Sequence, residues 1–285
     1  MLKFNTMKKA FVQFILLFVA YGGFAQQYYK DLLVVQAANI KHQLNRKANV
    51  KKITFASFDG DNNPIEGFTS EQEFKRDFSE VTTNTKTTLS GSSQSTSFFN
   101  NKDQLIKTVD TSESTRSEIN YTYNTNGQVS TISSVTGSAG SFLLKEVHQW
   151  TYNAQGKPVK MLKIKNDKDT TYVDFVADEK GNIGEEKSVL RGRPLPTVYY
   201  YYDDEKNLTD IVRYNIAAKR LLPDYIFEYE DKNRLGSMLV VPEEGSEYQK
   251  WYYSYDEDGL KILDACYSKT KVLIGRIEYR YEYYK

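Results

Sequence analysis

Aromatic residues alternate with polar residues along much of the chain after residue 95. Residues 119–123 (INYTY) and 251–255 (WYYSY) place an apolar or aromatic side chain at every second position, and Asn120 and Thr122 occupy the other parity of the first segment. A period of two is typical of a β-strand that buries one face and solvates the other. The pattern therefore predicts antiparallel strands with one aromatic face.

Each aromatic segment ends in a turn that opens with Asn or Asp and carries Gly, or in some copies another residue, at its fourth position. A left-handed residue at that position closes a tight β-hairpin. The strongest copies are YTYNTNGQV, WTYNAQGKPV, YYYYDDEKNL, FEYEDKNRL and WYYSYDEDGL, anchored at Tyr123, Tyr152, Tyr202, Tyr229 and Tyr255. Weaker copies are anchored at Phe58, Phe99 and Ala177, and from Phe99 onward the anchors lie 24 to 29 residues apart. A fixed period of this size indicates a repeat architecture.

The segments that follow these turns carry apolar residues three positions apart, which strict alternation does not allow. The pairs are Val129/Ile132, Val159/Leu162, Leu208/Ile211 and Leu235/Met238. A β-bulge just after the turn would bring both members of a pair to the aromatic face. We therefore expect one bulge in each hairpin.

Three tyrosines fall on the parity opposite to the aromatic face: Tyr199, Tyr201 and Tyr252. Exposed tyrosine rings could stack on sugar rings or on a peptide. These residues are the candidate binding site, for a glycan or an envelope protein. The competing interpretation is that the sheet is buried on both faces where it curves.

Hairpins of the form Y-x-Y-D-x-x-G-x-L at this spacing resemble the YD repeats of the Rhs and teneurin families, over roughly residues 95–285. In Rhs proteins the resemblance implies repeats that wind into a hollow shell around a toxin. This chain is too short for such a shell, and its last segment, IEYRYEYYK, is a half-copy of the repeat. It resembles instead the short exported YD-repeat-like proteins of Bacteroidetes, for which the resemblance implies no activity.

Residues 1–25 have the features of a signal peptide, because Lys8 and Lys9 precede the apolar run AFVQFILLFVA. Gly23 and Ala25 then supply the small residues that precede a cleavage site, so cleavage is expected after Ala25. The run is too short for a good transmembrane helix, and no later segment approaches the roughly 18 apolar residues that one needs. We therefore expect an exported protein that is periplasmic, associated with the outer membrane, or secreted.

Residues 26–47 are predicted to contain a short helix, since Leu33, Ala37, Ile40 and Leu44 recur at helical spacing. We expect this helix to cover one end of the sheet. Residues 48–285 then form one hairpin-repeat domain. Within it, the Ser/Thr-rich residues 82–97 fit either a loop or a solvated strand, and residues 133–141 (SSVTGSAGS) are predicted to be a loop.

The charge balance excludes a nucleic-acid partner as the default. The chain has 38 basic and 37 acidic residues, and removal of residues 1–25 takes away three lysines, so the net charge becomes 35 − 37, or about −2. The single cysteine, Cys266, rules out a disulfide framework within the chain.

The sequence predicts no catalytic, metal or cofactor site. His148 lies in a strand and His42 in the helix, with no reason to meet, and Cys266 fits a small buried residue better than a nucleophile. The best metal-like stretch, DGDNNPIEGFTSE, has Pro64 where a calcium loop needs Gly. We therefore expect a protein that is not an enzyme.

These observations predict an all-β fold: an antiparallel meander of repeated β-hairpins, about sixteen strands in a curved or coiled open sheet, preceded by a short helix. The expected function is that of an exported, non-enzymatic scaffold or binding protein of the cell envelope. One alternative is an outer-membrane β-barrel, against which the strands carry charges opposite the aromatic face. The other is a polysaccharide hydrolase.

Overall fold

The computed structural model describes residues 27–138, 143–215, 218–242 and 247–285, so the predicted signal peptide lies outside the described part. Helix α2 (Tyr29–Lys47) precedes the strands, and a 3₁₀ turn, η1 (Asp231–Asn233), lies among them. The strands are β1 (Val50–Asp59), β2 (Thr69–Phe74), β3 (Glu80–Thr87), β4 (Gly91–Phe99), β5 (Leu105–Ser112), β6 (Thr115–Tyr123), β7 (Val129–Ser138), β8 (Leu143–Tyr152), β9 (Pro158–Lys165), β10 (Asp169–Ala177), β11 (Ile183–Leu190), β12 (Arg193–Pro194), β13 (Val198–Tyr202), β14 (Leu208–Asn215), β15 (Arg220–Glu230), β16 (Arg234–Val240), β17 (Gln249–Tyr255), β18 (Lys261–Ser268) and β19 (Leu273–Tyr283).

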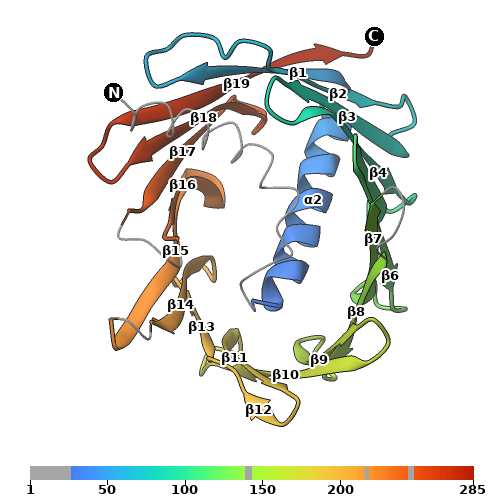
Figure 1. Cartoon of the computed structure of the whole chain (residues 1–285), viewed down its shortest axis with the longest axis vertical. Coiled ribbons are helices and arrows are strands. Elements are labelled where there is room, and N and C mark those ends of the chain that lie inside the picture. Colours follow the sequence, from blue (N-terminus) through green and yellow to red (C-terminus); the bar gives the residue numbers. More distant parts are fainter. Residues whose placement is uncertain (1–26, 139–142, 216–217, 243–246) are drawn as a thin grey trace.

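The strands form a closed β-barrel (Figure 1). Successive strands pair antiparallel, and β1 pairs both with β2 and with β19, from Val50↔Tyr283 to Asp59↔Gly275. The two-residue β12 is a side branch on β11, which also pairs directly with β13, so 18 strands make up the ring. The antiparallel meander is confirmed, but the expected open sheet of about sixteen strands is wrong. Closure pairs the backbone groups that two edge strands would have left free.

The predicted turns have the expected backbone. The glycines at the fourth turn position have φ values of 78° (Gly127), 76° (Gly156), 78° (Gly181) and 84° (Gly259). Where Gly is missing, Asp103, Lys206 and Asn233 adopt the same region, with φ of 57°, 67° and 55°. The opening side chain closes the turn from inside: Asn124 Oδ1 accepts hydrogen bonds from the N–H groups of Asn126 and Gln128.

The predicted bulges are also present, and each one follows a turn. Tyr123 pairs with Val129 while Thr122 pairs with Thr131, so one residue of the return strand is skipped. Equivalent register shifts occur in the hairpins anchored at Phe99, Tyr152, Ala177, Tyr202, Tyr229 and Tyr255. In each hairpin the inward-facing positions of the return strand are therefore six and nine residues after the anchor.

One predicted pair was misplaced by a residue. In the hairpin anchored at Tyr152 the inward residues are Pro158 and Met161, not Val159 and Leu162. Met161 pairs with Trp150 and is fully buried, whereas Leu162 is only partly buried. Because Pro158 occupies the sixth position after the anchor, the apolar pair with the expected spacing lies one residue further along the sequence, and the pattern predicted the wrong register.

In five copies of the repeat, a tyrosine hydroxyl links the segment to the hairpin before it. The hydroxyl of Tyr152 donates a hydrogen bond to the carbonyl oxygen of Val129 at 2.7 Å, and Val129 begins the return strand of the preceding hairpin. Four further tyrosines do the same: Tyr123 to Leu105, Tyr229 to Leu208, Tyr255 to Leu235 and Tyr281 to Lys261. A buried hydroxyl usually has such a partner, and these five bonds recur with the repeat, although the copies anchored at Ala177 and Tyr202 lack them.

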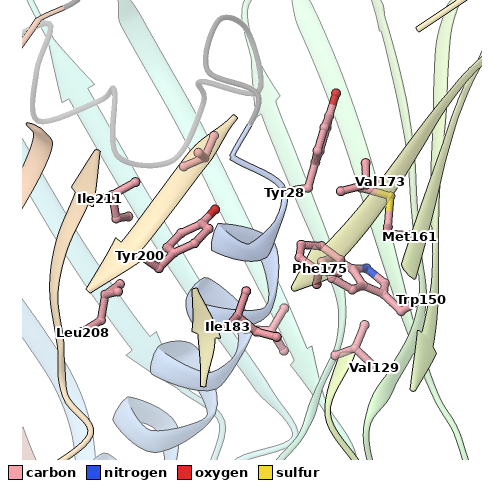
Figure 2. Close-up of a cluster of buried hydrophobic side chains, with 12 residues drawn as sticks. Tyr28, Val129, Trp150, Met161, Val173, Phe175, Ile183, Tyr200, Leu208 and Ile211 are labelled. Atoms are coloured by element: carbon pink, nitrogen blue, oxygen red, sulfur yellow. The ribbon is translucent and has the colours of Figure 1, made fainter. Parts of the chain in front are cut away.

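The inner face of the barrel carries the hydrophobic core. The largest cluster, drawn in Figure 2, contains Tyr28, Val35, Val129, Trp150, Met161, Val173, Phe175, Ile183, Val198, Tyr200, Leu208 and Ile211. Within it the rings of Trp150 and Phe175 stack at a centroid distance of 5.3 Å. A second cluster surrounds Ile53 and Phe74, and a third surrounds Met238 and Trp251.

Helix α2 lies inside the ring rather than over one end of the sheet, which corrects the expected position (Figure 1). The face that it buries is also different from the predicted one. Val35, His42 and Asn45 are buried, whereas Ala37 is exposed and Ile40 is 49% exposed. Of the predicted stripe, Leu33 and Leu44 pack against the core clusters, whereas Ala37 and Ile40 face away from the barrel wall that holds the helix.

Two segments with uncertain or loop-like sequences belong to strands. The Ser/Thr-rich residues 82–97 lie largely in β3 and β4, and side-chain hydroxyls pair across the strands, as between Thr82 and Thr96. Residues 133–138 extend β7, so the loop predicted for 133–141 is wrong there, and residues 139–142 lie outside the described part. β-branched threonine side chains suit a strand with solvated faces.

Candidate functional site

The barrel is too wide for one helix to fill. Eighteen strands about 4.8 Å apart give a circular ring roughly 27 Å across even without strand tilt, and tilt widens it. A helix with its side chains is only about 10–12 Å wide. The space enclosed by the strands, here termed the lumen, is the candidate site.

A buried carboxylate holds the start of α2. Glu186 on β11 is fully buried, and its oxygens accept hydrogen bonds from the backbone N–H of Tyr28 at 3.0 Å and of Tyr29 at 2.9 Å. The hydroxyl of Tyr200 also donates to Glu186, at 2.8 Å. Burial raises the pKa of Glu186 to about 7, although these hydrogen bonds act in the opposite direction. The carboxylate satisfies N–H groups that a helix start leaves free and complements the positive end of its dipole.

A chain of charged groups fixes the first turn of α2 to the barrel wall. His148 on β8 lies between Asp31, 2.5 Å from Nδ1, and Glu146, 3.0 Å from Nε2, and Lys163 pairs with Glu146 at 3.0 Å. Burial alone would lower the pKa of His148, but its hydrogen bonds to the two carboxylates raise it to about 9. His148 is therefore a positioning residue for the helix.

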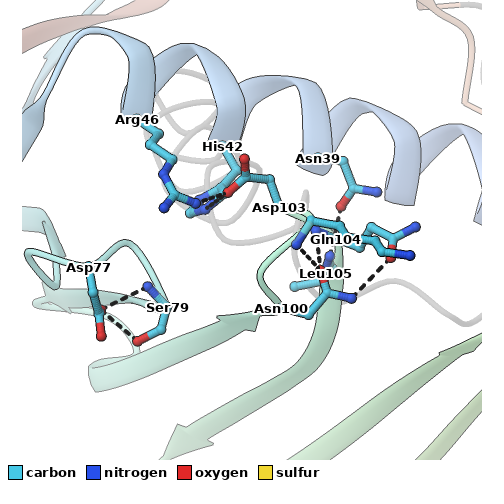
Figure 3. Close-up of polar contacts among 10 residues, drawn as sticks. Asn39, His42, Arg46, Asp77, Ser79, Asn100, Asp103, Gln104 and Leu105 are labelled. Carbon is cyan, nitrogen blue, oxygen red and sulfur yellow. Dashed lines mark hydrogen bonds and ion pairs between the residues drawn. The ribbon is translucent and has the colours of Figure 1, made fainter. Parts of the chain in front are cut away.

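The second half of α2 binds the wall through polar side chains (Figure 3). Asn39 Oδ1 accepts a hydrogen bond from the N–H of Leu105 at 2.8 Å, and Arg46 pairs with Asp103 at 2.5 Å. His42 stacks on Phe99 with ring centroids 3.6 Å apart and planes within 4°. Because these contacts come from one face of the helix, they leave the other face to the lumen.

The face of α2 turned to the lumen, here termed the lumenal stripe, consists of Lys30, Val34, Ala37, Ile40 and Lys41. Val34 is 57% exposed and Ile40 49% exposed, although the strands surround the helix. Lys30 is engaged, since its Nζ donates to the hydroxyl of Tyr225 at 2.7 Å. Apolar helix positions that are enclosed by the ring yet accessible to solvent indicate open space beside the helix.

Lys41 is accessible to solvent although the surrounding protein partly removes water from its charged group. Its side chain is reached by solvent, but the protein around it lowers its pKa to about 8, through burial first and the nearby charge of Lys261 second, with Asp264 acting in the opposite direction. Lys261 itself pairs with Asp264 at 3.0 Å and lies over the ring of Tyr253. Asp264 Oδ2 also accepts a hydrogen bond from Tyr279, at 2.8 Å. Within the described part of the chain, no carboxylate forms an ion pair with Lys41, although the charge of Asp264 acts on it.

The three tyrosines proposed for binding lie on the outer face, but not together. Tyr201 is 48% exposed and Tyr252 45% exposed, while Tyr199 is partly buried. Strands β14, β15 and β16 separate Tyr252 on β17 from the other two on β13. Tyr252 instead contacts Tyr267 edge to face. The structure therefore leaves Tyr199 and Tyr201 as one outward-facing pair and Tyr252 as a separate position.

The residues with possible catalytic or metal chemistry are dispersed. His42 and His148 serve different turns of α2, and Cys266 is buried, which raises the pKa of its thiol to about 12. Asp59 Oδ1 accepts hydrogen bonds from the N–H groups of Asp61 and Asn63, as in an ordinary turn. Among the described residues, no group of three or more His, Cys, Asp or Glu side chains is arranged to hold a metal ion. No helix in the described ranges is long and apolar enough to cross a membrane.

The apolar pattern of the sequence did not predict the polar residues of the lumen, although the repeat contains a signal for them. The inward positions six and nine residues after the anchor are apolar in most copies, as in Leu208 and Ile211. Glu186 occupies the ninth position after Ala177, and Lys261 and Asp264 occupy both positions after Tyr255. Charged residues at positions that are otherwise apolar mark the interior sites.

No family model and no curated protein matches the chain. Among solved structures, it is similar to a chain in the crystal structure of TcdB2-TccC3-Cdc42, with 13% identity and a TM-score of 0.34, over 73% of this chain and 12% of that chain. It is also similar to porin-like proteins from Bacteroides uniformis ATCC 8492 (11% identity, TM-score 0.40) and Bacteroides vulgatus ATCC 8482 (12% identity, TM-score 0.28), each over 82% of this chain and 98% of that chain. These weak likenesses do not establish membership of a YD-repeat family and carry no argument about function.

Proposed function

We propose that this protein is an exported, non-enzymatic binding barrel of the cell envelope, with its ligand site in the lumen and its outer face in water. The observation that supports this function best is the apolar, solvent-accessible stripe of α2 within a closed ring of strands. Wide barrels enclose ligand cavities or channels, and ligand sites are concave spaces lined by apolar side chains and a few polar groups. Export rests on the signal-like residues 1–25.

The outer face supports a barrel surrounded by water. Ion pairs cross neighbouring strands there, with N–O distances of 2.8 Å for Lys107–Glu118, 2.7 Å for Lys52–Glu71, 2.8 Å for Lys250–Glu228 and 3.8 Å for Lys160–Asp174. A lysine on the lipid face of a membrane barrel costs about 2–4 kcal/mol at the bilayer centre. Several such residues spread around the ring are therefore unfavourable in a bilayer.

An outer-membrane barrel is the second candidate, and closure into a ring of 18 strands is the observation that favours it. The outer face also carries exposed aromatic residues, including Tyr172, Tyr201 and Tyr214. They alternate with the ion pairs, whereas a lipid-facing surface requires a continuous apolar band. This difference makes the water-exposed barrel our first choice.

Cell fractionation distinguishes the two candidates. The full-length chain is expressed in a Gram-negative host, and the envelope is separated into soluble and membrane fractions with and without detergent. We expect the processed protein in the soluble fraction without detergent. Recovery only after detergent extraction of the outer membrane would replace the first candidate with the second.

The outward-facing pair of Tyr199 and Tyr201 remains a proposed contact for a glycan or an envelope protein. The variant carrying Tyr199→Ala and Tyr201→Ala is expected to stay folded and to lose adhesion to an envelope or glycan fraction. Tyr252→Ala, with three strands between it and the pair, is the matched control and should retain adhesion. Unchanged adhesion of the double variant would remove this surface from the proposal.

A further inference from the structure

We infer that the lumen binds an amphipathic anion, a molecule with one carboxylate-like group and an apolar tail, with the anionic group at Lys41 and the tail along the lumenal stripe. This inference rests on the proposed function, because it assigns a ligand class to the same lumen. It assigns a role to the apolar helix residues that the core does not use.

The charge of the lumenal stripe points to an anion. The stripe contains lysines and no acid, and the single acidic residue of α2, Asp31, is paired with His148 on the opposite side. Lys261, whose charge acts on Lys41, forms an ion pair with Asp264. Among the described residues, Lys41 is thus the lysine of the stripe that forms neither an ion pair nor a hydrogen bond to a ring hydroxyl, in surroundings that increase the strength of a charge-assisted hydrogen bond.

The apolar part of the stripe points to a tail rather than to a small ion. Val34 and Lys41 are seven residues apart, which is about 10 Å along a helix axis, and Ala37 and Ile40 lie between them. The exposed side chains of Val34 and Ile40 do not stabilise the barrel without a ligand. A ligand that covers them would gain about 25 cal/mol of binding free energy per Å² of apolar surface removed from water. An extended acyl chain matches both the length and the chemistry of this strip.

The test uses two fluorescent probes, a dansyl-labelled undecanoic acid and its methyl ester, which has no charge and one methyl group more. Both are titrated into the soluble, processed protein without detergent. We expect the acid to bind at least about tenfold more tightly than the ester, because only the acid gains the ion pair. Equal binding of the two probes would overturn the assignment of the anionic group.

Variants locate the site. Lys41→Gln should remove the difference between acid and ester, whereas Lys102→Gln, on an exposed turn, should preserve it. Ile40→Gln should weaken the binding of both probes several-fold. Ile106→Gln, at an exposed position on β5, should leave the binding of both probes unchanged. Acid binding that Lys41→Gln does not reduce would overturn the inference.

The outcomes separate this inference from the function on which it rests. A barrel that is soluble without detergent and binds neither probe would contradict the lumenal ligand alone. A barrel recovered only in detergent would contradict the proposed function. Thermal unfolding of each variant establishes that a loss of binding is not a loss of fold.

Discussion

At the scale of single residues, neighbouring side chains of β13 lie on opposite faces of the barrel, one in the core and the next at the surface. Tyr200 is 2% exposed and donates to Glu186, whereas its neighbour Tyr201 is 48% exposed. Tyr200→Ala should lower the free energy of unfolding by about 3–5 kcal/mol, the range for losing a buried aromatic side chain. Tyr201→Ala should lower it by less than about 0.5 kcal/mol. Urea denaturation measures both, and equal losses would contradict the inward position of Tyr200.

Backbone conformation offers a second test at this scale. Gly259 has φ of 84°, and an added Cβ there would lie in open space, so the cost of Gly259→Ala is conformational, about 1–2 kcal/mol. Gly236 lies in β16, where an added Cβ would make only ordinary contacts at 3.5 Å or more. Gly236→Ala is therefore the control, and its unfolding free energy should stay within about 1 kcal/mol of the original. A larger loss at Gly236 than at Gly259 would contradict the hairpin geometry.

At the scale of elements, α2 is attached through groups that titrate. The pKa of Glu186 is raised from 4.5 to about 7, so the folded protein binds this proton more tightly than the unfolded chain. The contribution of Glu186 to stability therefore falls as pH rises from about 4.5 to 7, by roughly 3 kcal/mol at most. Glu186→Gln should remove that decline, which is measured as the difference in unfolding free energy between variant and original at each pH.

The neighbouring acid supplies the control for this titration. Glu185 lies on the outer face and pairs with Lys187 at 2.6 Å. Glu185→Gln should leave the decline between pH 4.5 and 7 in place. If both variants follow the same pH curve as the original, the buried position of Glu186 does not govern the attachment of α2.

Much of the hairpin repeat could be predicted from the sequence, because its determinants are local. The turn residues, the left-handed fourth position and the bulge all lie within ten residues of each anchor, as around Tyr123. The position of α2 could not be predicted, since several of its docking residues, such as Asn39 and His42, are polar, while the apolar Ile40 is exposed. Closure of the ring also had no local signal, because it pairs residues that lie far apart in the sequence, such as Val50 and Tyr283.

At the scale of the whole molecule, the ring predicts uniform protection of its backbone. If β1 and β19 pair as described, their amides should exchange with deuterium as slowly as those of β17 and β18. An open sheet would instead leave alternate amides of β1 unbonded and fast to exchange. Hydrogen exchange followed by mass spectrometry on peptides from Val50–Asp59 and Leu273–Tyr283 distinguishes these cases.

The seam between β1 and β19 sets the order in which the molecule can assemble. Every other pairing in the ring joins strands that are close in sequence, and such contacts form early because their loops cost little entropy. The seam joins residues more than 200 positions apart, as at Val50 and Tyr283. A chain without β19 cannot close the ring, so β1 and β18 would each keep an unpaired edge. Unpaired edges of this kind pair readily with other chains, so protection of the sheet from aggregation depends on the pairing that β19 supplies.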